Sequence, residues 1–105
     1  MATTTPTLSV AFVARIVAKA DTCDEVGAFL ASAVQLANDE AGTLVWFALR
    51  TDQTTFWIVD AFASETDRQT HINGPIAAAL MANAERLLAA PPEILPADVL
   101  ASKLP

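Results

Sequence analysis

The segment 43–50 constrains the fold most, because it is apolar on both of its alternating faces. Successive side chains of a β-strand point to opposite faces of the sheet. The two faces carry Val45, Phe47 and Leu49 on one side, and Leu44, Trp46 and Ala48 on the other. Neither set suits contact with water, so a sheet that contains this strand needs cover on both faces.

The composition indicates what provides that cover. The chain has 105 residues, enough for one domain. Hydrophobic residues make up 53% and charged residues 17%, whereas typical domains have about 45–50% and about 25%. A domain of this length buries only roughly 60–70% of the surface of its unfolded chain. We therefore expect helices on one face of the sheet and an identical subunit, in a homodimer, on the other.

Hydrophobic periodicity predicts a strand, a helix and a hairpin in the first half of the chain. The strand covers residues 8–19, and the helix begins at the capping-box pattern Thr22–Glu25 and ends at Gly42. Strands over 43–50 and 54–62 follow, and the short turn between them predicts an antiparallel pair.

The second half predicts a helical region and an edge strand. A second cap pattern, Ser64–Asp67, opens a short helix, and Gly74 and Pro75 end it and start the next one. That helix stops at Pro91-Pro92. The tail contains Pro96, which suits an edge strand because proline cannot donate a ladder hydrogen bond.

The resulting order, β-α-β-β-α-β, predicts an α+β fold of the ferredoxin-like split βαβ type with one antiparallel sheet. We interpret residues 1–7 as a flexible N-terminal leader and residues 8–105 as a single domain.

The charge balance and the single cysteine exclude several classes of function. Six basic and twelve acidic residues give a net charge of −6, and no basic cluster is available for nucleic acid or an anionic membrane surface. One cysteine and one histidine are too few ligands for a structural zinc site, so we expect no metal. The start of the chain lacks the pattern of a secretory signal, and no apolar run approaches the ~20 residues of a membrane span. We expect a cytoplasmic protein.

The stretch from Phe56 to Pro75 resembles the signature of the antibiotic biosynthesis monooxygenase family. In that family a strand of the form F-x-x-x-E-x-W precedes a short polar helix that ends in His. Here Phe56, Asp60, Phe62 and His71 occupy those positions, with Asp60 in place of the commoner Glu and Phe62 in place of the commoner Trp. The resemblance implies a dimeric α+β barrel.

The resemblance also implies a range of activities. The family includes small oxygenases that oxidise aromatic polyketides or quinols with molecular oxygen and without metal or flavin, haem-degrading proteins, and members of no known activity. The haem-degrading pattern has an Asn where this chain has Ala14 and a Trp where it has Phe62. We therefore expect no haem and no other cofactor.

His71 and Asp60 are the candidate catalytic residues. The imidazole of His71 is the only side chain whose unperturbed pKa suits proton transfer near neutral pH. Asp60 lies on an apolar strand and needs a partner if buried, which His71, Arg15 or Arg50 can supply. An Asp60–His71 pair would orient the imidazole as a base. The alternatives are a helix-end role for His71 and a structural ion pair for Asp60.

Four further residues are candidates for substrate binding. The aromatic side chains of Trp46, Phe56 and Phe62 can line a slot for an aromatic ring, although strand spacing also explains them as core. Arg50 can hold an anionic group, although strand arginines commonly pair with a neighbouring acid or reach solvent.

Two functions follow from the sequence. The first is a cofactor-independent monooxygenase that oxidises a small aromatic, quinol or polyketide-like substrate, with His71 as base, Asp60 as its orienting group and Trp46 and Phe62 as walls. The second is a non-catalytic, small-molecule-binding or stress-responsive dimer with the same fold. The lack of tyrosine, a common phenolic donor, favours the second.

Overall fold

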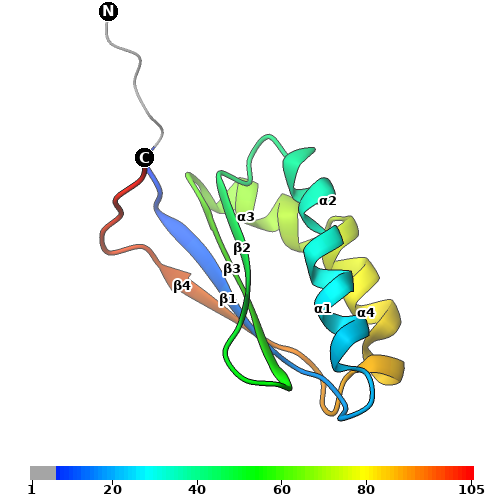
Figure 1. The fold of residues 1–105 in the computed structure, drawn as a ribbon. Helices are drawn as coiled ribbons and strands as arrows, with labels where there is room; N and C mark the ends of the chain where they lie inside the picture. The colour runs from blue at the N-terminus through cyan, green and yellow to red at the C-terminus, as the bar shows by residue number, and fades with distance from the viewer. Residues whose placement is uncertain (1–6) are drawn as a thin grey trace, which may run out of the picture.

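A computed structural model describes residues 7–105, which form one four-stranded antiparallel sheet and four helical segments (Figure 1). The strands are β1 (Val10–Val17), β2 (Val45–Arg50), β3 (Thr55–Phe62) and β4 (Glu93–Asp98), in the spatial order β2-β3-β1-β4. The helices are α1 (Cys23–Ser32), α2 (Val34–Asn38), α3 (Glu65–Ile72) and α4 (Pro75–Leu87). This arrangement confirms the predicted α+β, ferredoxin-like fold.

The helices lie on one side of the sheet (Figure 1) and cover its even-numbered face. On β1 this face carries Ala14 and Ile16, which lie opposite Ile58 and Phe56 of β3. These residues pack in one buried cluster with apolar residues of α1 and α4, namely Val26, Leu30, Leu80 and Leu87. Burial of this face therefore holds both long helices against the two central strands.

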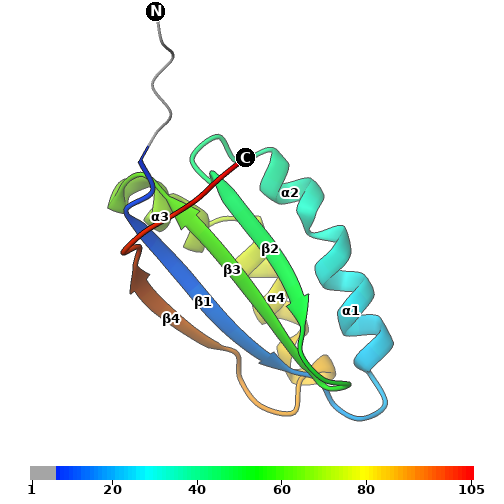
Figure 2. The ribbon, with the colours of Figure 1, turned by 60° about the vertical axis from the view of Figure 1, so that its left-hand side comes forward.

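The odd-numbered face has no helix against it (Figure 2). Its middle row crosses all four strands, since the strand register aligns Phe47 with Val59, Val59 with Val13, and Val13 with Leu95. Phe47 and Leu95 are each 54% exposed. The tail after β4 crosses one end of this face (Figure 2), where Val99 packs against Leu8, Ala11 and Ala61. The predicted two-sided apolar sheet is confirmed.

The helix after β1 differs from its prediction in three respects. It begins at Cys23 as predicted, but Thr22 makes no side-chain cap, because its hydroxyl donates instead to the carbonyl of Leu87 at 2.6 Å. Glu25 forms an ion pair with Arg86 and does not close a capping box. The helical region is divided at Ala33 and ends at Asn38, and no glycine among residues 7–105 has a positive φ. The predicted helix end at Gly42 is therefore wrong, and Gly42 does not adopt the left-handed conformation that commonly ends a helix.

Gly42 has a different role, in the loop between α2 and β2. A Cβ atom at this position would lie 2.6 Å from the Oδ1 atom of Asp67 on α3. Only a glycine lets the loop approach α3 so closely. This approach places the loop residues Glu40 and Thr43 beside His71.

Other local predictions hold. Ser64 caps α3, since its hydroxyl oxygen accepts a hydrogen bond from the backbone N–H of Asp67 at 3.2 Å. Pro75 occupies the first turn of α4, and Pro96 lies on the edge strand β4. The predicted leader, residues 1–7, lies outside the described residues except for its last position. No helix within residues 7–105 combines the length and apolar character that crossing a membrane requires.

Candidate active site

Asp60 is a buried carboxylate on the helix-covered face of β3. Its side chain is 2% exposed, and apolar residues precede and follow it on this face. The Oδ1 atom accepts a hydrogen bond from the backbone N–H of Phe12 on the adjacent β1, at 3.2 Å. The Oδ2 atom lies 2.9 Å from Nε2 of His71. These two contacts compensate for the loss of hydration that burial imposes on the carboxylate.

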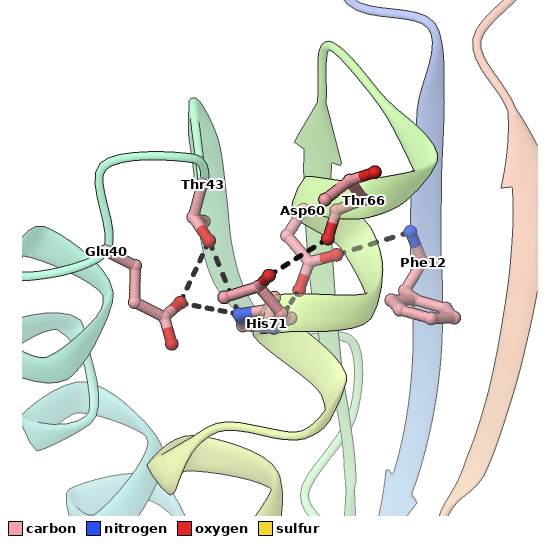
Figure 3. Close-up of polar contacts among 7 residues, drawn as sticks. Phe12, Glu40, Thr43, Asp60, Thr66 and His71 are labelled. Atoms are coloured by element: carbon pink, nitrogen blue, oxygen red, sulfur yellow. Dashed lines mark hydrogen bonds and ion pairs between the residues drawn. The ribbon is translucent and has the colours of Figure 1, made fainter.

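His71, near the end of α3, lies between two carboxylates (Figure 3). Its side chain is 6% exposed, and its Nδ1 atom lies 2.6 Å from Oε1 of Glu40, opposite the contact with Asp60. Thr43 donates its hydroxyl to the same Glu40 oxygen at 2.9 Å. The ring of Phe62 packs against the imidazole, with 5.2 Å between centroids. The imidazole is thus fixed on both edges.

The electrostatic environment favours the imidazolium form of His71. Burial of the ring by itself lowers the pKa of His71. The hydrogen bonds to Asp60 and Glu40, together with the negative charges of both carboxylates, outweigh burial and raise the pKa above its ordinary 6.5. In this form each ring nitrogen carries a proton that it donates to one carboxylate.

A small apolar cavity adjoins this cluster, between the sheet and the helices α3 and α4. Its volume is about 30 Å³, and its polar groups come from Asp60 and His71. The remaining lining is apolar: Phe12, Ala14, Ile58, Ile72, Ile76, Ala77, Leu80 and Ile94. An apolar cavity of about 150 Å³ is known to hold a benzene ring. The space therefore suits a diatomic or water-sized molecule, and an aromatic ring requires the lining to move apart.

A second depression lies on the other side of His71. This outer groove has a volume of about 330 Å³ and runs along the α2–β2 loop and the start of α4. It is lined by Asp39, Glu40, Ala41, Gly42, Thr43, Asp67, Thr70, His71, Gly74 and Pro75. His71 contributes to the lining of both spaces and therefore lies between the groove and the cavity.

The structure brings together some of the predicted site residues. The predicted Asp60–His71 contact is present, and Phe62 lies against the imidazole. Trp46 lies opposite Asp60 on β2 and packs into the core, with its indole N–H buried and unpaired.

Arg50 and Phe56 lie toward the other end of the sheet. Arg50 on β2 pairs with Phe56 on β3. Phe56 lies four positions before Asp60, which corresponds to roughly 13 Å along the strand. The Arg50 guanidinium lies 5.0 Å from the centre of the Phe56 ring and donates to the carbonyl of Gln53 in the hairpin turn. Neither residue lines the cavity beside His71.

Sequence reasoning missed Glu40. It lies in the loop after α2, outside any periodic pattern, and is one of twelve acidic residues. Only the chain path around Gly42 places it next to a histidine 31 residues away. Within residues 7–105 no cluster of three metal-ligating side chains can hold a metal ion. Glu40 and Asp60 contact opposite edges of the imidazole, so they do not converge on one cation.

Comparisons with known proteins place the chain among solved structures. No family model and no curated protein matches the sequence. A protein of unknown function from Nitrosomonas europaea is 50% identical, with a TM-score of 0.93 over 96% of this chain and 98% of that one. A "Putative antibiotic biosynthesis monooxygenase" of the same organism is 15% identical, with a TM-score of 0.77 over 88% and 90% of the two chains. A protein of the same description from Chloroflexus aurantiacus is 18% identical, with a TM-score of 0.69 over 90% and 96%. The last two likenesses show a shared fold.

Proposed function

The chain belongs to the family of the Nitrosomonas europaea protein of unknown function and has the fold of antibiotic biosynthesis monooxygenases, and from this premise we propose that it is a cofactor-independent monooxygenase. Its substrate would be a small phenol, quinol or polyketide-like aromatic, and its oxidant molecular oxygen. The observation that carries the proposal is the buried Asp60–His71 pair at the polar end of an otherwise apolar cavity.

Such a reaction needs little from the protein beyond a dry site and a proton acceptor. When the O–H bond of a phenol breaks, its proton passes to the Asp60–His71 pair and the electron pair stays on the substrate oxygen. The phenolate then transfers an electron to dioxygen, and a C–O bond forms between the two radicals. One oxygen atom remains in the product as a carbonyl, and the other leaves as water with the two hydrogens that the substrate loses. Exclusion of water strengthens the electrostatic contacts to the phenolate.

The cavity has to widen for an aromatic substrate. Its present volume of about 30 Å³ leaves room for dioxygen beside the carboxylate but not for a ring. The lining includes Ile94 from the edge strand β4, whose hydrogen-bond ladder runs to β1 alone, and Ala77 from α4, which is not paired with β4. Separation of these two elements is the simplest route by which a substrate would enter.

We further propose that the exposed sheet face forms a homodimer. The middle row of this face is apolar across all four strands, and its two edge-strand members, Phe47 and Leu95, are each 54% exposed in one copy. A second sheet packed on it would bury this area and give the two-layered barrel expected from the sequence. An interface near the standard size of roughly 1,600 Å² is expected.

A second candidate function has one observation in its favour. The cavity is small and lined mainly by aliphatic side chains, and it offers no polar group besides Asp60 and His71 to orient a substrate. A non-catalytic protein that binds a small apolar molecule satisfies this description equally well.

Oxygen consumption distinguishes the two functions. We would incubate the purified protein with a panel of quinols and hydroxylated polycyclic aromatics and record oxygen uptake, with Asp60→Asn as the matched control. Oxygen uptake by the wild type above the autoxidation rate supports the monooxygenase, provided that Asp60→Asn lowers this protein-dependent uptake by a factor of roughly 10²–10⁴. Saturable ligand binding without uptake supports the binding protein and refutes catalysis for that panel.

A further inference from the structure

We propose that Asp60, and not His71, takes the proton of the substrate, and that Glu40 is the positioning residue that makes His71 a cationic partner of Asp60. This inference rests on the proposed function and assigns the roles within the same site. It reverses the roles that the sequence suggested, and it adds a residue that the sequence did not reveal.

The two nitrogens of His71 leave no lone pair for a substrate. A general base needs a free lone pair within hydrogen-bond reach of the proton it removes. Nδ1 faces Glu40 at 2.6 Å and Nε2 faces Asp60 at 2.9 Å. Because an ionised carboxylate only accepts hydrogen bonds, both nitrogens have to donate to satisfy the two contacts, which the imidazolium form does. For His71 to act as the base, one of these carboxylates would have to move away while remaining buried.

Asp60 has the free lone pairs that His71 lacks. A carboxylate offers about four acceptor sites, and the described contacts of Asp60 use two of them, for the N–H groups of Phe12 and His71. The carboxylate also lines the apolar cavity, as does the aromatic ring of Phe12. A phenolic O–H group in this cavity therefore meets an available acceptor in Asp60.

Glu40 is held in place for its contact with His71. Thr43 donates its hydroxyl to the same Oε1 atom that faces the imidazole, and the side chain of Glu40 is 16% exposed. Gly42 lets this loop lie against Asp67 at the start of α3. These contacts fix a negative charge on the groove side of the ring, opposite Asp60.

No second cation competes with His71 in the described part of the chain. From β3 the ring faces Asp60, and from the α2–β2 loop it faces Glu40 and the neutral Thr43. The α4 residues of the cavity are apolar. On α3 itself, Asp67 contacts Ser64, whereas the Arg68 guanidinium binds backbone carbonyls of β1 and β4 and the carboxylate of Glu65. The two carboxylates around His71 therefore determine its charge.

The proton step follows from this charge distribution. The substrate O–H bond breaks, its proton forms a bond to the Asp60 carboxylate, and its electron pair stays on the substrate oxygen. His71 keeps both protons, and its positive charge stabilises the phenolate beside it. When the O–O bond of the peroxide formed with dioxygen cleaves, the C–H bond at the carbon that bears it also breaks, and the electron pair of that bond forms the carbonyl. The departing oxygen leaves as water, with this hydrogen and the proton that Asp60 returns, and the site is restored without exchange with solvent.

Nuclear magnetic resonance of the imidazole tests the charge assignment without any substrate. The chain has one histidine, so the imidazole ¹⁵N signals of the untagged protein need no assignment. We expect the imidazole of the wild type to titrate with a midpoint above its ordinary pH of 6.5. We expect Glu40→Gln, which keeps a hydrogen-bond acceptor, to lower the pH of the titration midpoint. Asp39→Asn removes an exposed charge from the same groove and should leave the midpoint almost unchanged. A wild-type midpoint at or below pH 6.5, or equal effects of the two variants, overturns the proposal.

The pH dependence of turnover tests the assignment of the base. If His71 is the base, the rise of kcat/KM with pH coincides with the ¹⁵N midpoint and shifts with it in Glu40→Gln. Under our proposal the rise does not coincide with the imidazole titration, and Glu40→Gln lowers kcat with little change in KM. Coincidence of the two titrations overturns the assignment. If no substrate gives oxygen uptake, the proposed function fails, and the ¹⁵N result still decides the charge state of His71.

Discussion

The substitution Phe47→Asp should dissociate the proposed dimer. Phe47 stands in the middle row of the exposed sheet face and is 54% exposed. A phenylalanine carries roughly 150–250 Å² of surface, so about 80–135 Å² of it faces solvent in one copy. At about 25 cal/mol per Å², full cover by a partner sheet stabilises the dimer by about 2–3 kcal/mol for each copy, or about 4–7 kcal/mol in total.

The loss is large enough to measure by sedimentation. Because about 1.4 kcal/mol corresponds to tenfold in the dissociation constant, removal of the phenyl ring alone weakens the dimer by about a thousandfold or more. The buried aspartate adds a desolvation cost in the same direction. We expect a wild-type dimer at micromolar concentration and a folded Phe47→Asp monomer under the same conditions, the latter with an unchanged far-ultraviolet circular dichroism spectrum.

Met81→Asp is the matched control. Met81 is 56% exposed, on α4 of the helical layer, so the same charge is introduced at similar exposure away from the sheet face. This variant should sediment as the wild type does. A monomeric wild type, or equal dissociation by both substitutions, would refute the reasoning from the apolar sheet.

Three further predictions concern stability. The pKa of His71 is raised in the folded protein, so protonation of this residue should stabilise the fold fully below about pH 6.5, and this contribution should be lost as the pH rises through the pKa of the folded protein. Urea titrations between pH 6 and 9 should show a falling free energy of unfolding. Glu40→Gln should make this fall smaller. Leu80→Ala should lower the free energy of unfolding by about 2–5 kcal/mol, because the substitution enlarges the cavity. The larger cavity should also bind small aromatic ligands more tightly, which calorimetry would measure. Ser64→Ala should cost about 0.5–2 kcal/mol in the same titrations, because the start of α3 loses its side-chain cap; a change within error would show that the cap is dispensable.

The strands and most of the core could be predicted from the sequence because they depend on local periodicity. Alternation of apolar residues identified β2 and β3, and the proline in the tail indicated an edge strand. The capping box at Thr22 failed because its hydroxyl found a closer partner in Leu87, which is 65 residues away in sequence. Such long-range competition for a hydrogen bond leaves no mark in local sequence.

The site could be predicted in part for the same reason. Asp60 stood out as a carboxylate in an apolar strand, and His71 as the only histidine. Glu40 joined them only through the close approach of its loop to α3, and the aliphatic cavity depends on how α4 packs over the sheet. Arg50 and Phe56 lie on the same face of the sheet as Asp60. The alternation of side chains along a strand identifies this face but does not indicate which positions along the strand belong to the site.

The buried contacts of Asp60 also explain how the central strand β3 adopts one register in a sheet that is apolar on both faces. A one-residue shift of β3 would exchange its two faces, and apolar contacts alone discriminate weakly between Phe56, Ile58 and Phe62 on one side and Trp57, Val59 and Ala61 on the other. Asp60 breaks this degeneracy, because after such a shift its carboxylate would lose the N–H of Phe12 and the imidazolium of His71 and would enter the apolar sheet face. An unpaired charge buried in the proposed dimer interface on that face costs several kcal/mol. We infer that the same carboxylate proposed to accept the substrate proton also selects the register of the central strand.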